Sequence, residues 1–150
     1  MKHQSSVPAM IAALFLSLLP LSAAAPVMQV YKTPTCGCCG KWVEHMKANG
    51  FDVKVTEVPS TLEYRQKYGV PEKLQSCHTA VVNRYTIEGH VPAADVQRLL
   101  KTKSESKGLA VPGMPIGSPG MEQGTGSQAY SVVLFDEKGA TSEFRKYEAK

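Results

Sequence analysis

Apolar and polar residues alternate along several short stretches of the chain, which is the pattern of β-strands that bury one face. The segment 51–58, Phe-Asp-Val-Lys-Val-Thr-Glu-Val, predicts such a half-buried strand. Four further runs are rich in β-branched and aromatic residues and are also predicted to be strands: 28–31, 79–83, 130–135 and 141–147. The segment 83–89 continues the run 79–83 as a hairpin.

Helical spacing appears between the predicted strands. Cys39, Val43 and Met46 are spaced i, i+4 and i+7, so they fall on one face of a helix that ends at Asn49-Gly50. Ser60-Thr-Leu-Glu63 has the form of a capping box and opens a second helix. Helices are therefore predicted over three segments: 40–49, 60–68 and 92–100.

The order of these elements predicts the fold class. Strand and helix alternate twice, and two strands, a helix and a C-terminal hairpin follow. The segment 109–126, rich in proline and glycine, is predicted to be a loop. No internal repeat or domain boundary is visible in the 150 residues. We predict one domain, a small mixed α/β sheet with flanking helices.

The N-terminus has the layout of a secretory signal peptide. Lys2 provides a positive start, residues 7–21 are apolar, and the small residues Ser22-Ala-Ala-Ala25 follow. The apolar stretch is too short for a transmembrane helix. We predict a signal peptide of residues 1–24, cleaved after residue 24, and a mature periplasmic domain of residues 25–150 that is not inserted in a membrane.

Charge excludes one class of partner. The net charge is +4, from 17 basic and 13 acidic residues, and no run of five or six lysines or arginines occurs. This mild and scattered excess predicts no nucleic-acid binding. An exported chain meets oxidising conditions, so its four cysteines need a specific explanation.

Three of the four cysteines lie within four residues, in the motif Cys36-Gly-Cys38-Cys39 at a predicted strand-to-helix turn. Unpaired backbone N–H groups and the helix dipole at such a turn favour thiolate. Cys77 lies just before the third strand. In a sheet of this kind both segments can end at the same edge, which would bring all four sulfur atoms together.

The cysteine pattern leaves three interpretations open. Structural disulfides are one, and the sensible pairing would be Cys36–Cys39 with Cys38–Cys77, because adjacent cysteines form strained bridges. Thiol–disulfide exchange is the second, since Cys36 and Cys39 form a C-x-x-C motif. Metal binding is the third. Paired zinc knuckles are missing, whereas thiolates select soft Cu(I).

Cu(I) accepts few ligands, and one thiolate can bridge two or more ions, so packed thiolates suit a multinuclear cluster. Four thiolates and four Cu(I) ions also sum to zero charge. His78, Met114 and Met121 are candidates for additional metal ligands, against the alternative that they only pack or hydrogen-bond locally. His90 is the weaker candidate, because a histidine at a turn commonly bonds the backbone.

Four sequence blocks together carry a family resemblance: 31–42 (Tyr-Lys-Thr-Pro-Thr-Cys-Gly-Cys-Cys-Gly-Lys-Trp), 76–79 (Ser-Cys-His-Thr), 88–92 (Glu-Gly-His-Val-Pro) and 108–122. In these blocks the chain resembles the CopG-type periplasmic copper-resistance proteins. The resemblance implies a thioredoxin-like fold and a copper site. The implied ligands are Cys36, Cys38, Cys39 and Cys77.

The resemblance also implies a function. We expect a periplasmic protein that holds Cu(I) for copper sequestration and resistance, and that exchanges copper with other periplasmic copper-handling proteins. Interconversion of Cu(I) and Cu(II), which would make it a copper oxidoreductase, is left open. Thioredoxins place a proline near the position of Cys77 or His78, and a proline supplies no ligand. This departure disfavours the alternative, a thiol–disulfide oxidoreductase using Cys36 and Cys39.

Overall fold

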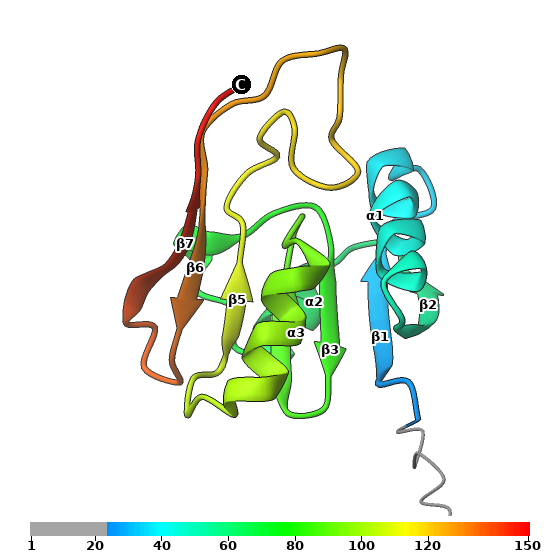
Figure 1. The fold of residues 1–150 in the computed structure, drawn as a ribbon. Helices are drawn as coiled ribbons and strands as arrows, with labels where there is room; N and C mark the ends of the chain where they lie inside the picture. Colours follow the sequence, from blue (N-terminus) through cyan, green and yellow to red (C-terminus); the bar gives the residue numbers. More distant parts are fainter. Residues whose placement is uncertain (1–23) are drawn as a thin grey trace, which may run out of the picture.

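The computed structural model describes residues 24–150, which are built around a sheet of seven strands (Figure 1). The predicted signal peptide of residues 1–24 lies almost wholly outside the described residues and stays a prediction. Within residues 24–150, no helix has the length and apolar character needed to cross a membrane.

The elements follow one another in the predicted order, with two additions, η1 and β5. The strands are β1 (Val27–Lys32), β2 (Asp52–Glu57), β3 (Thr79–Val82), β4 (Tyr85–Glu88), β5 (Gly108–Ala110), β6 (Tyr130–Phe135) and β7 (Thr141–Tyr147). The helices are α1 (Gly37–Ala48), α2 (Leu62–Lys67) and α3 (Ala93–Thr102), with a short 3₁₀ helix, η1 (Glu72–Leu74).

The sheet is mixed, with the strand order β2-β1-β3-β4-β5-β6-β7. β1 pairs in parallel with β2 across α1, and β4 pairs in parallel with β5 across α3. The remaining neighbours are antiparallel. The predicted mixed α/β class is thereby confirmed, and the closer likeness to thioredoxin stays a prediction.

Helices cover both faces of the sheet. Val30 and Tyr31 are consecutive in β1 and so point to opposite faces. Val30 lies in the core with Trp42 of α1 and Leu99 of α3. Tyr31 instead stacks on Tyr64 of α2, with the ring centroids 4.0 Å apart. α1 and α3 therefore bury the main core on one face, and α2 packs on the other.

Two sequence predictions need correction. The segment 109–126 is not all loop, because β5 occupies Gly108–Ala110 between β4 and β6. The strand predicted over 51–58 is an edge strand, and Val55 is 41% exposed. Only the flanking residues Phe51 and Val58 are buried there.

Turn geometry differs from expectation at two positions. The capping box predicted at Ser60 does not form: Thr61 caps α2 without a side-chain hydrogen bond, and Ser60 Oγ accepts from Leu62 N at 3.2 Å. The β3–β4 hairpin turns through Asn83, where a glycine would be the usual residue. Asn83 adopts a positive φ of 51°, a conformation that asparagine tolerates better than most residues.

Candidate metal centre

The centre is built where β1 runs into α1. The chain turns after β1, with Cys36 N donating to Thr33 O at 3.2 Å, and α1 begins at Gly37. Cys36 is the N-cap residue, and no side chain caps the helix. Cys38 and Cys39 therefore lie in the first turn of α1, where free backbone N–H groups favour a negatively charged sulfur.

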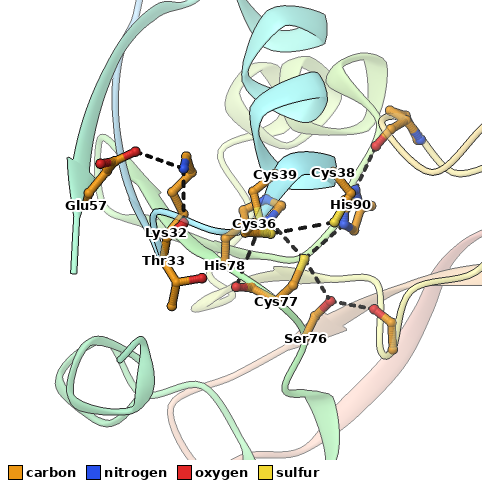
Figure 2. Close-up of a disulfide and its surroundings, with 12 residues drawn as sticks. Lys32, Thr33, Cys36, Cys38, Cys39, Glu57, Ser76, Cys77, His78 and His90 are labelled. Atoms are coloured by element: carbon orange, nitrogen blue, oxygen red, sulfur yellow. Dashed lines mark hydrogen bonds and ion pairs between the residues drawn. A yellow bond between two sulfur atoms is a disulfide. The ribbon is translucent and has the colours of Figure 1, made fainter. Parts of the chain in front are cut away.

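The four sulfur atoms that the sequence singled out lie together. They are all within 4.8 Å of one another, and belong to Cys36, Cys38, Cys39 and Cys77. Figure 2 shows Cys77, from the segment before β3, facing the three cysteines at the N-terminus of α1. The Cys36 and Cys38 sulfur atoms are 3.6 Å apart. This is the arrangement expected if β1 and β3 meet at the same edge of the site.

Two of these cysteines form a disulfide bond. Cys36 is joined to Cys39, and Cys38 and Cys77 are free (Figure 2). The first half of the pairing considered from the sequence is therefore present, and the second bridge, Cys38–Cys77, is not. Reduction of the Cys36–Cys39 bond is required before all four sulfur atoms can act as thiolates.

Two histidines extend the cysteine group on the side of Cys77. The Cys77 sulfur lies 3.2 Å from His78 Nδ1 and 2.9 Å from His90 Nε2 (Figure 2). His90 Nδ1 lies 2.8 Å from Pro119 O, and because a carbonyl only accepts, this ring nitrogen carries the proton. The lone pair of His90 Nε2 is therefore turned toward Cys77. Metal-bound histidines are commonly oriented by such a backbone contact.

Burial sets the protonation of these groups. Burial is the main cause that raises the pKa of Cys77 to about 12, and the nearby Cys38 sulfur raises this pKa further. Burial likewise lowers the pKa of His90 and, more strongly, that of His78. At neutral pH the metal-free site thus presents neutral imidazoles and a protonated Cys77 thiol, so a metal ion must displace the Cys77 proton.

The raised pKa of Cys77 predicts slow alkylation. With the Cys36–Cys39 disulfide intact and metal absent, we expect iodoacetamide to modify Cys77 with a rate that rises about tenfold per pH unit up to about pH 11, because only the thiolate reacts. Mass spectrometry of Cys77 peptides measures this rate. The urea-unfolded protein is the control, with a plateau above about pH 9. The same early plateau in the folded protein would contradict the prediction.

The two candidate methionines line a groove beside Cys38. The groove has a volume of about 420 Å³, and Met114, Met121 and Lys41 are among its walls. Met114 is 52% exposed, so its thioether is accessible from solvent. The structure thus brings both methionines near the open side of the cysteine group, whereas His78 and His90 lie on its buried side.

Gly120 lets the segment 112–121, here called the methionine loop because it carries Met114 and Met121, approach α1 closely. A Cβ atom at this position would lie 2.7 Å from Cys38 O and 2.8 Å from Trp42 N, which is closer than side chains pack. Gly120 also has a positive φ of 87°. The neighbouring Pro119 O contacts His90. This one approach therefore fixes the loop against both the helix and the histidine.

His90 lies in this group although the sequence made it only a weak candidate. The β3–β4 register pairs Thr79 with Glu88, and continuing that register by two residues puts Cys77 opposite His90. The predicted hairpin over 83–89 contained this information. The sequence did not determine the exact position of the turn, and a different turn would have shifted every cross-strand pair.

Comparisons with known proteins agree with one another. The chain is similar to two solved structures named copper resistance protein CopG. For Form 1 the identity is 41% over 81% of this chain and 97% of that chain, with a TM-score of 0.77. For Form 2 the identity is 41% over 82% and 98%, with a TM-score of 0.76. Residues 74–121 match the family described as a protein of unknown function, DUF411. A search of curated proteins found no match.

Proposed function

Because the chain belongs to the family of the copper resistance protein CopG, we propose that it binds copper as Cu(I) through four cysteine thiolates and so serves copper sequestration and resistance. The observation that carries the proposal is that four sulfur atoms lie within 4.8 Å of one another. The ligands we assign are Cys36, Cys38, Cys39 and Cys77.

The donor set fits Cu(I) on chemical grounds. Thiolates are soft ligands, and four of them in one place can bridge several Cu(I) ions, which also cancels their charge. We therefore propose a multinuclear cluster. His78 and His90 turn ring nitrogens toward Cys77, so they are proposed as further ligands on the buried side of the cluster.

Copper loading is coupled to disulfide chemistry in this proposal. The Cys36–Cys39 bond must first accept two electrons and two protons from a thiol or another reductant, and it then yields two thiols. Each thiol that binds Cu(I) releases its proton. Interconversion of Cu(I) and Cu(II) would add an oxidoreductase activity, because packed copper–sulfur centres exchange electrons.

The first experiment is an anaerobic titration of the reduced mature protein with Cu(I), followed by metal analysis and counting of alkylated thiols. The proposal expects more than one copper per chain, with all four thiols protected. The matched control is the same protein with the Cys36–Cys39 disulfide intact, which should retain less copper. A reduced protein that retains no copper would contradict the proposal.

A second candidate function rests on the disulfide itself. Cys36 and Cys39 form the bond expected of a C-x-x-C thiol–disulfide oxidoreductase, and it lies at a helix N-terminus. Cys38 disfavours this activity, because its sulfur lies 3.6 Å from that of Cys36 and would compete with incoming thiols. Ready cycling of two thiols with a substrate protein, together with no copper binding, would favour the oxidoreductase.

Removing both methionine thioethers is expected to weaken Cu(I) binding without destabilising the fold. In the variant Met114→Ala/Met121→Ala we expect Cu(I) affinity to fall about tenfold, equivalent to about 1.4 kcal/mol. The reason is that both side chains line the groove beside Cys38. Competition with a Cu(I) chelator measures the affinity. Leu62→Ala is the control, because Leu62 is similarly exposed but lies on α2. Unchanged affinity would remove both methionines from the site.

Localisation and partners follow from the same proposal. We propose that the chain is exported by its predicted signal peptide and works in the periplasm. Its partners there would be copper ions and other copper-handling proteins. N-terminal sequencing of the protein purified from the periplasm should begin at Ala25, and an N-terminus at Met1 would contradict this part.

A further inference from the structure

A buried ion pair, Arg65 with Glu88, contacts the residue that precedes Cys77. Glu88 of β4 is fully buried, and its Oε1 accepts from Arg65 Nε of α2 at 3.0 Å. The same oxygen accepts from Ser76 N at 2.7 Å. Glu88 Oε2 accepts from Thr79 Oγ1 at 2.6 Å. Both carboxylate oxygens are therefore used by partners on three other segments of the chain.

The ion pair binds both backbone polar groups of Ser76, the residue before Cys77. Glu88 accepts from the N–H of Ser76, and Arg65 Nη2 donates to the carbonyl of the same residue. Ser76 Oγ donates in turn to Gly113 O, at the start of the methionine loop. Ser76 lies in the irregular connection between η1 and β3, where no strand pairing holds the chain.

Gly89 shows how tightly this segment is enclosed. A Cβ atom on Gly89 would lie 2.6 Å from Ser76 Cβ and 2.7 Å from Val111 O. Ser76 is thus held between the end of β4 and the residues after β5. The backbone position of Cys77, the next residue, is therefore restricted as well.

We infer that Arg65 and Glu88 are positioning residues for the copper site: by fixing the backbone of Ser76 they hold the Cys77 sulfur against the other three sulfur atoms and His90. The inference rests on the proposed function, since it concerns the same copper site. A buried ion pair is weak evidence for stability, because apolar replacements are often equally stable. Outer groups that orient a ligand, in contrast, commonly change metal affinity about 10- to 100-fold.

The protein contains a matched control for a purely structural role. Asp95 of α3 is also a fully buried carboxylate, with Oδ2 accepting from Tyr147 at 2.7 Å and Oδ1 lying 3.4 Å from Arg145. Both partners lie on β7, and within residues 24–150 neither forms a hydrogen bond with a cysteine. Asp95→Asn should therefore reduce stability and leave copper binding as in the wild type.

The test compares Glu88→Gln, Arg65→Met and Arg65→Lys with Asp95→Asn, all in the reduced mature protein. We expect Glu88→Gln and Arg65→Met to lower Cu(I) affinity about 10- to 100-fold in competition with a chelator. In the copper-loaded variants we expect Cys77 to become open to alkylation while the other three cysteines, Cys36, Cys38 and Cys39, stay protected. Arg65→Lys keeps the charge but cannot reach both partners, so we expect an intermediate loss.

Each outcome decides the inference. Glu88→Gln and Arg65→Met variants that bind Cu(I) as the wild type does would overturn it, and so would an Asp95→Asn variant that loses as much affinity. If the Glu88 variant does not fold, Arg65→Lys decides alone, through the alkylation of Cys77. A wild-type protein that binds no Cu(I) would refute the proposed function and this inference together, whereas wild-type binding with unaffected variants refutes only the inference.

Discussion

Replacing Cys38 by serine is expected to abolish copper retention while leaving the Cys36–Cys39 disulfide intact. Cys38 is free, lies 3.6 Å from the Cys36 sulfur and lines the groove through which the cysteine group faces outward. Under the proposed function its loss removes a direct ligand, so the fall in Cu(I) affinity should exceed the about 100-fold change that outer groups cause. Metal analysis after desalting measures the effect.

The same variant separates the two candidate functions. A C-x-x-C oxidoreductase needs only Cys36 and Cys39, so Cys38→Ser should preserve its exchange activity or improve it. Thiol counting under oxidising and reducing conditions supplies the control that the disulfide still forms. A variant that keeps its full complement of copper would show that Cys38 is not a ligand and would remove the main argument for a four-cysteine cluster.

The largest expected effect on stability comes from Trp42→Ala. Trp42 is fully buried in α1, its Nε1 donates to Val91 O at 2.9 Å, and its ring lies 4.3 Å from that of His78. Truncating a buried aromatic ring costs about 3–5 kcal/mol, and the whole stability of a typical domain is only about 5–15 kcal/mol. Urea unfolding of the metal-free protein should show this loss.

Trp42→Phe is the matched control for that prediction. Phenylalanine keeps most of the apolar contact but cannot donate to Val91 O, so it leaves a carbonyl without its partner, at a cost of about 1–3 kcal/mol. The alanine variant should therefore be clearly less stable than the phenylalanine variant. Equal losses would mean that the hydrogen bond, rather than the packing of the ring on His78, carries the contribution of Trp42.

Much of the fold is readable from the sequence because most elements carry a regular pattern. Cys39, Val43 and Met46 follow helical spacing, and all are buried on one face of α1. β5 gives no such signal. Its three residues are all buried, so they do not alternate, and the segment is shorter than any reliable period. Gly108 also lies so close to the Thr86 carbonyl that a Cβ atom would overlap it, which only the folded sheet reveals.

The candidate site divides in the same way. Spacing alone places Cys36, Cys38 and Cys39 together, and the strand order suggests that Cys77 joins them. The burial of Glu88 is invisible in sequence, because an isolated glutamate on a short strand looks like a solvent-facing residue. Its partner Arg65 lies 23 residues away on the opposite face of the sheet from α1. Such pairs depend on packing between helix and sheet, which no local pattern encodes.

The disulfide between Cys36 and Cys39 has a physiological consequence. Under the proposed function, a chain in this form cannot offer four thiolates, and each chain must receive two electrons before it can. The amount of copper held by a population of these molecules would then follow the supply of reductant as well as the supply of metal. Under the same proposal, conditions that oxidise thiols would keep metal-free molecules closed to copper until a reductant opens the bond again.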